Sequence, residues 1–196
     1  MSKVLVPLAK GFEEIEAVSM IDIMRRGGIE VIVVALDEEM DVLGANDITV
    51  KAQRSIVGLH ADDIDMIALP GGWGGTYALA DDENVQSLLK EMDKKGKDIG
   101  AICAAPFALK KAGVLKETYT CYPSVEDEIK QDGYQGDRSQ IVQTQNVLTS
   151  RGPGTAICFA LAIVKRLMGE ENYSAVREGT LSLHCKCLLL EAGGKQ

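Results

Sequence analysis

Cys103 has the surroundings that most clearly suggest chemistry in this chain of 196 residues. It follows the apolar run 99–102, and Ala101 and Ala105 lie two residues away on either side. Small residues at these positions let a strand and a helix meet at a sharp turn that presents a nucleophile. A thiol at the start of a helix is also expected to have a lowered pKa. The alternative is a small buried side chain, because free cysteine is among the most buried residue types.

A glycine-rich stretch, PGGWGG at 70–75, follows another apolar run. Consecutive backbone N–H groups without shielding side chains are typical of an anion or oxyanion site. The stretch lacks the glycine order of a dinucleotide-binding loop and the lysine of a phosphate loop. A tight turn explains the same glycines equally well, so both interpretations remain open here.

Three glutamates, Glu13, Glu14 and Glu16, occupy the start of a helix expected over 11–28. Acidic side chains at this position complement the helix dipole, which is sufficient reason for any one of them. Glu16 also shares a helix stripe with the apolar Met20, and Glu14 lies on a similar stripe. A carboxyl group beside apolar side chains has a raised pKa, as a general acid or base requires. Periodicity does not choose between the two roles.

The chain contains two histidines, His60 and His184. His60 precedes a strand and is therefore expected at the sheet end opposite the predicted site. His184 belongs to the run His184-Cys185-Lys186-Cys187, whose ligands are too crowded for zinc spacing. We expect a surface or structural role for both histidines and no metal site. The C-terminal tail is expected to be disordered or replaceable by another sequence.

Composition excludes several classes of protein. The formal net charge of −8 and the absence of a long basic run argue against nucleic acid as a partner. No apolar run approaches the roughly 20 residues of a membrane helix, and the first residues do not resemble a signal peptide. Five scattered cysteines are typical of a reducing compartment rather than of a disulfide scaffold. We predict one cytoplasmic domain that binds neither nucleic acid nor membrane.

Strands and helices are expected to alternate, which indicates an α/β sandwich with a largely parallel sheet. The expected strands cover 4–8, 29–36, 65–69, 99–102, 118–122 and 145–150, and the expected helices 11–28, 83–96, 105–113 and 152–169. A hairpin is predicted within 37–55. Ligands bind such sheets where loops leave the carboxyl ends of the strands. The loops of interest are therefore 9–14, 70–75, 103–106 and 150–155.

Four motifs taken together resemble a known family. AKGFEEIEAV, LPGG, AICAAP and TSRGPGTA, in this order and spacing, are similar to the ThiJ/PfpI superfamily and its DJ-1 branch, from about residue 3 to about residue 180. The resemblance implies a flavodoxin-like three-layer sandwich with a strand-cysteine-helix nucleophile elbow. It also implies one domain over 1–181, followed by a tail, 182–196, of unassigned role, and it implies a homodimer.

The resemblance also implies roles for individual residues. Cys103 corresponds to the reactive nucleophile and Glu16 to the protonated carboxyl group that hydrogen-bonds it. Gly72 and Ala104 would supply backbone N–H groups to an oxyanion, and Arg54 would approach the partner's site across the dimer. No cofactor and no metal are implied.

The implied activity is cofactor-independent thiol chemistry of the glyoxalase III or protein deglycase type. Methylglyoxal and early glycation adducts of amines would be the substrates. An alternative is an oxidative-stress sensor or redox-regulated chaperone that uses oxidation of Cys103. A cysteine peptidase is the third hypothesis, and it is disfavoured because residues 121–140, where some members carry a histidine, contain none.

Overall fold

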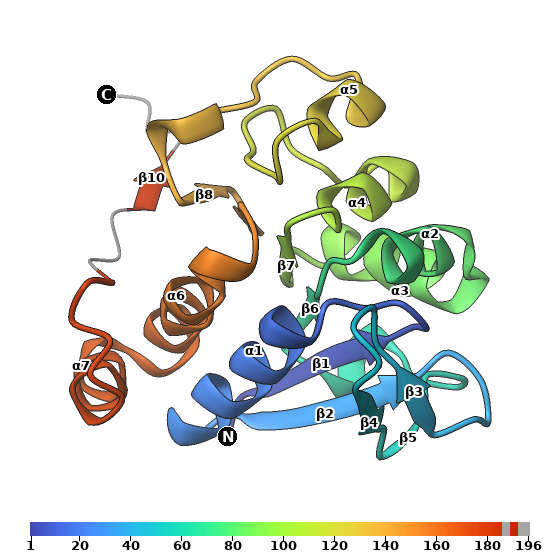
Figure 1. Cartoon of the computed structure of the whole chain (residues 1–196), viewed down its shortest axis with the longest axis horizontal. Helices are drawn as coiled ribbons and strands as arrows, with labels where there is room; N and C mark the ends of the chain where they lie inside the picture. The colour runs from blue at the N-terminus through green and yellow to red at the C-terminus, as the bar shows by residue number, and fades with distance from the viewer. Residues whose placement is uncertain (186–188, 192–196) are drawn as a thin grey trace.

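A central sheet of eight strands organises the computed structural model, which describes residues 1–185 and 189–191 (Figure 1). Its strand order is β10-β8-β9-β7-β6-β1-β2-β5. All neighbours pair in parallel except β8 and β9, which are antiparallel. The strands are β1 (Lys3–Leu8), β2 (Glu30–Ala35), β5 (Arg54–Ser55), β6 (Met66–Leu69), β7 (Asp98–Ile102), β8 (Ile141–Thr144), β9 (Val147–Ser150) and β10 (Leu189–Glu191).

Helices cover both faces of this sheet (Figure 1). One core cluster contains the buried sides of α1 (Glu14–Arg26), α6 (Ala156–Met168) and α7 (Glu170–Gly179). The other contains those of α2 (Trp73–Asp81), α3 (Glu83–Lys94) and α4 (Pro106–Ala112). Strand residues alternate between the clusters, as the period of a β-strand requires: Val4 and Val6 face α1, and Leu5 faces the other way. The predicted three-layer sandwich with a largely parallel sheet is confirmed.

Short elements complete the chain. They are α5 (Val125–Ile129), the antiparallel hairpin of β3 (Asp41–Leu43) and β4 (Thr49–Lys51), and the 3₁₀ turns η1 (Ala61–Asp63), η2 (Gly136–Arg138) and η3 (Pro153–Thr155). The hairpin predicted within 37–55 is therefore confirmed. Within the described residues, no helix combines the length and hydropathy that crossing a membrane would require.

Helix α1 brings its first turn to the carboxyl edge of the sheet. It begins after Glu13, whose side chain caps the helix by accepting a hydrogen bond from the backbone N–H of Glu16 at 2.7 Å. Arg25 and Arg26 occupy the last turn, where cations suit the helix dipole. The helix starts later than expected because residues 11–12 remain in the loop after β1.

Three sequence expectations about secondary structure are wrong. Residues 73–75 of the expected loop 70–75 belong to α2, and Gly75 packs against Phe12 so closely that an added Cβ would lie 3.0 Å from the Phe12 backbone. Glycine is unfavourable in helix interiors, so the low helix propensity of this segment is overridden by the tertiary contact. Residues 118–122 form no strand, only an isolated bridge between Tyr119 and Tyr134. Strand β8 was not anticipated, because its four residues carry no clear alternation.

The expectations for the cysteines and for the chain's end also need correction. Cys158 and Cys185 form a disulfide, although the scattered spacing had suggested unpaired thiols. Cys185 is buried, and β10 extends the sheet beside β8. The start of the tail is therefore packed against the domain rather than disordered. The pair could not be read from the sequence because the two cysteines are 27 residues apart. They meet because the chain returns along α7 to the first turn of α6. Lys186 and Cys187 lie outside the described residues.

Candidate active site

Cys103 lies at a sharp bend directly after β7. Its φ of 65° places it in the left-handed region, which costs a non-glycine residue roughly 1–3 kcal/mol. Both of its backbone groups are fixed: the N–H donates to Ser150 O at 3.0 Å, and the carbonyl accepts from Tyr122 N at 2.9 Å. Helix α4 begins three residues later. The predicted strand-cysteine-helix elbow is therefore present, with Cys103 held in a strained conformation.

Glu16 is fully buried in the first turn of α1. Its Oε2 accepts a hydrogen bond from the Gly71 N–H at 2.7 Å, and its Oε1 has no hydrogen-bond partner among the described residues. Burial raises the pKa of Glu16 to about 7, and the nearby Cys103 side chain and the Gly71 N–H only partly oppose this shift. At neutral pH this carboxyl group is therefore present in both protonation states.

The pKa of the Cys103 thiol is raised above its ordinary value. Burial is the largest cause, and the negative charge of Glu16 and its interaction with the thiol add to it. The backbone N–H groups of Gly72 and Ala104 act in the opposite direction and favour the thiolate. The expected lowering of this pKa at the helix start is thus wrong in net direction, because burial and Glu16 outweigh the N–H groups.

Cys103 and Glu16 lie so close together that a negative charge on one disfavours a negative charge on the other. Two anions in this place would repel each other in a poorly solvated environment. A proton on Glu16 removes the charge that opposes the thiolate, and Gly72 and Ala104 then remain to stabilise it. The site can therefore hold a thiolate at Cys103 while Glu16 carries the proton.

Gly71 is a site residue that sequence reasoning missed. A Cβ added to it would lie 2.6 Å from the Cβ of Cys103, 2.7 Å from Glu16 Oε2 and 3.0 Å from the N of Ala104. These three groups converge on one point because Gly71 has no side chain. The signal in the sequence is the double glycine after β6, of which the family resemblance implies a role for the second, Gly72, alone.

Replacing Gly71 with alanine is expected to separate Cys103 from Glu16. The new methyl group overlaps atoms on both sides, so either the loop or α1 must shift, at a cost of about 1–3 kcal/mol. We expect a lower melting temperature and the loss of most activity. Thermal unfolding and turnover, compared with Gly179→Ala at the end of α7, check this, since a Cβ at Gly179 meets nothing within 4 Å. Equal behaviour of the two variants would contradict it.

The structure does not bring the other predicted residues to Cys103 within one chain. Arg54 lies on β5 at the far end of the sheet, and its Nε donates to Ser55 O. Its contact across a dimer stays a prediction. His60 caps η1 before β6, at the opposite sheet end as expected, and His184 lies beside the disulfide.

Access to Cys103 is narrow. The residue is only 9% exposed. A hollow of about 200 Å³ lies next to its backbone partner, lined by Tyr122, Pro123, Arg151 and residues 152–155. A larger hollow of about 450 Å³ lies where β1 and β2 end, and neither Cys103 nor Glu16 lines either hollow. The low exposure of Cys103 therefore suits a small reactant.

One group of side chains has the composition of a metal site. Cys158, His184 and Cys185 place their ligand atoms within 4.8 Å of one another. The two sulfur atoms are bonded to each other, so neither is a thiolate, the form in which cysteine binds metals. In this oxidised state the cluster is not suited to holding an ion.

Comparisons with known proteins agree with this geometry. The DJ-1/PfpI family matches residues 2–166. Protein dj-1beta of Drosophila melanogaster is 39% identical over 183 residues, which cover 92% of this chain and 98% of the relative. The crystal structure of Drosophila melanogaster DJ-1beta superimposes with a TM-score of 0.88 at 38% identity, covering 92% of this chain and 98% of that one. A Schizosaccharomyces pombe protein named glutathione-independent glyoxalase DJ-1 is 34% identical over 90% of this chain and 96% of its own.

Proposed function

The chain belongs to the DJ-1/PfpI family, and from this premise we propose that it converts small 2-oxoaldehydes such as methylglyoxal to 2-hydroxy acids, with Cys103 as nucleophile and without glutathione. The observation that carries the proposal is the strained Cys103 with one buried carboxyl group and two backbone N–H groups around it. The name of the Schizosaccharomyces pombe relative supports the same reaction class.

The chemistry follows from the positions of these groups. The Cys103 thiolate adds to the aldehyde carbon, and the hemithioacetal oxygen is stabilised by the N–H groups of Gly72 and Ala104. The protonated Glu16 first gives its proton to this oxygen. The resulting carboxylate then moves the proton from the former aldehyde carbon to the neighbouring carbonyl carbon, and the hydroxyl proton passes to the neighbouring oxygen, which leaves a thioester at Cys103. Water hydrolyses the thioester, so methylglyoxal and one water give lactate and regenerate the thiol.

The narrow access to Cys103 supports small aldehydes as the principal substrates. A residue that is 9% exposed admits a molecule of a few atoms more readily than a folded protein surface. Early glycation adducts on flexible amines present the same carbon and extend the proposal to deglycase activity. The described residues place neither histidine beside Cys103, so we do not propose a peptidase.

Lactate formation in the absence of glutathione tests the proposal. We expect the purified full chain to convert methylglyoxal to lactate in stoichiometric amounts, as measured by an enzymatic lactate assay and by NMR. Glutathione should leave the rate unchanged. Consumption of methylglyoxal without lactate, or no consumption by the folded protein, would refute the activity.

An oxidation sensor is the second candidate function. Among the described residues Cys103 and Cys121 are the free cysteines, and Cys103 has the N–H groups of Gly72 and Ala104 beside its sulfur. The same groups would hydrogen-bond the oxygens of a sulfinic acid, and a protonated Glu16 would add a third donor. A folded protein that forms no lactate would favour this role over the enzymatic one.

We also propose a homodimer formed through α1. Ile15 and Val18 are 58% and 47% exposed and lie three positions apart, so they form a pair of neighbouring apolar side chains on the surface of this helix. A lysine at Val18 is expected to shift the protein from dimer to monomer in analytical ultracentrifugation. Leu181→Lys, a matched change at an exposed apolar residue elsewhere, should leave the dimer intact. A monomeric wild type, or a dimer that tolerates Val18→Lys, would contradict this arrangement.

A further inference from the structure

The disulfide between Cys158 and Cys185 joins two distant parts of the chain. Cys158 lies in the first turn of α6, and Cys185 follows α7, 27 residues later. We propose that this pair is a reversible dithiol–disulfide couple, a second oxidation site besides Cys103, and that its closure fastens the C-terminal segment to α6. The inference does not rest on the proposed function, since neither cysteine belongs to the Cys103 site.

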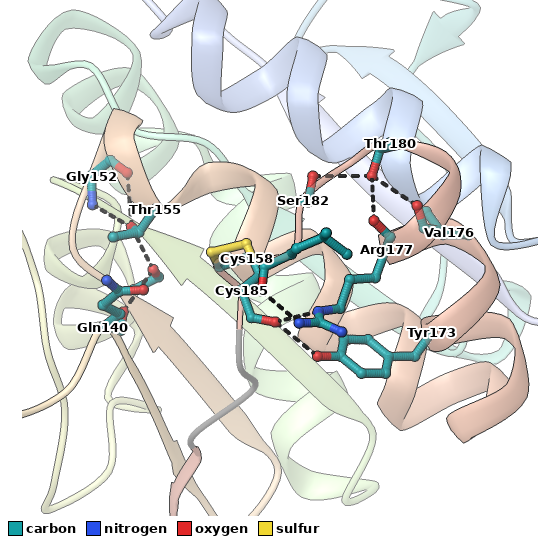
Figure 2. The surroundings of a disulfide bond; sticks show 12 residues. Gln140, Gly152, Thr155, Cys158, Tyr173, Val176, Arg177, Thr180, Ser182 and Cys185 are labelled. Carbon is teal, nitrogen blue, oxygen red and sulfur yellow. Dashed lines mark hydrogen bonds between the residues drawn. A yellow bond between two sulfur atoms is a disulfide. The ribbon is translucent and has the colours of Figure 1, made fainter.

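Hydrogen bonds hold Cys185 in place independently of its sulfur (Figure 2). The Tyr173 hydroxyl and the Arg177 Nε both donate to the Cys185 carbonyl, at 3.0 and 2.8 Å. Arg177 Nη2 also donates to the Leu183 carbonyl at 2.5 Å, and Ser182 N donates to Arg177 O. The segment 182–185 is therefore held on α7 by contacts that do not involve the sulfur atoms, and the disulfide adds a covalent link from this segment to α6.

This anchoring makes the pair reversible. The Cα atoms of Cys158 and Cys185 are 5.1 Å apart, within the range that a disulfide needs. After reduction Tyr173 and Arg177 keep the two thiols close, so each has a high effective concentration for the other. Oxidation then closes the same bond again rather than a random one.

The bond also controls where the chain leaves α7 for the sheet. Only residues 186–188 separate Cys185 from β10, and β10 pairs with β8 through three residue pairs. So short an edge strand has little stability of its own. With the disulfide closed, Cys185 is tied to α6 as well as hydrogen-bonded to α7. With it open, only the hydrogen bonds to α7 hold Cys185, so we expect β10 to leave β8 more often and to expose the edge of the sheet.

The chemistry balances with a dithiol as the reductant. A thiolate of the dithiol attacks one sulfur of the Cys158–Cys185 bond, and its second thiol releases the mixed disulfide. The pair gains two electrons and two protons, and the reductant becomes a disulfide. Cys158 and Cys185 are buried, and the exposed Leu183 and His184 directly precede Cys185, so local opening of this segment is the expected route of access.

Hydrogen exchange and disulfide mapping on the full chain test the proposal. A Cys103→Ser background removes the other proposed oxidation site. The protein is equilibrated with oxidised glutathione or with dithiothreitol, and thiols are identified by differential alkylation and mass spectrometry. We expect a Cys158–Cys185 bond that opens and reforms. We also expect amide exchange in 189–191 to rise at least tenfold on reduction, and the melting temperature to fall by roughly 5–10 °C.

Two further variants make the outcome decisive. Cys185→Ser should show the fast exchange under both conditions, and Cys121→Ser, which changes a free cysteine outside the pair, should behave like its background. A pair that stays reduced in oxidised glutathione, a bond from Cys158 to Cys187, or exchange that is equal in both states would each overturn the proposal. Because Cys103 is absent from this experiment, its result is independent of the lactate assay.

Discussion

Replacement of Cys103 by alanine is expected to lower lactate formation from methylglyoxal by on the order of 10³-fold or more, because the reaction loses the nucleophile that forms the hemithioacetal and the thioester. The fold should survive, since Cys103 N and O are fixed by backbone hydrogen bonds to Ser150 and Tyr122 that do not involve the sulfur. The rate at saturating methylglyoxal, together with the melting temperature, measures both effects.

The matched control is Cys121→Ala. Cys121 is also a buried free cysteine, and its sulfur lies 3.9 Å from Glu126 Oε2 rather than beside Glu16. Its replacement should leave the rate within a factor of a few. Full activity in Cys103→Ala, or equal losses in the two variants, would show that Cys103 is not the nucleophile.

Replacement of Glu16 by glutamine is expected to separate activity from stability. Glutamine keeps an acceptor for the Gly71 N–H but does not transfer the proton between carbons, so lactate formation should fall by roughly 10²–10⁴-fold. The wild-type rate should change near pH 7, where Glu16 titrates, and the residual rate of the variant should lack this inflection.

The same variant should be more stable than the wild type at high pH. Burial raises the pKa of Glu16 from an ordinary 4.5 to about 7, so the folded protein binds this proton more tightly than the unfolded chain does. Wild-type stability therefore declines as pH rises from about 4.5 to about 7, and the full cost, up to about 3 kcal/mol, is present above that. Glu16→Gln avoids this cost, so the two proteins should differ at pH 8 and converge near pH 4.

Glu14→Gln gives a control of opposite sign. Glu14 is also buried in the first turn of α1, which by itself raises its pKa. Hydrogen bonds from the backbone and side chain of Asn46, at 2.6 and 2.9 Å, outweigh this and lower the pKa overall. Its replacement should therefore destabilise the protein at pH 8. Urea unfolding of both variants at pH 4 and pH 8 makes the comparison, and a less stable Glu16→Gln at pH 8 would contradict a buried, uncompensated carboxylate.

Local patterns in the sequence were sufficient for the elements that carry the site. Short apolar runs and helical spacing predicted β1, β2, β6, β7, α1, α3, α4 and α6 close to their observed bounds. The alanines around Cys103 predicted a sharp turn, and the stripe shared with Met20 predicted a buried face for Glu16. These features depend on residues a few positions apart, so the sequence alone contains them.

The tertiary structure decided what those patterns could not. Gly71 became a site residue because α1 and β7 approach it from opposite sides, and the thiol pKa rose because burial and Glu16 outweigh the N–H groups of Gly72 and Ala104. The pairing of Cys158 with Cys185 likewise depends on the return of the chain along α7. Burial, charge repulsion and disulfide bonding act between atoms that are close in space. The net pKa shifts and the cysteine pairing are therefore determined only when the whole chain has packed.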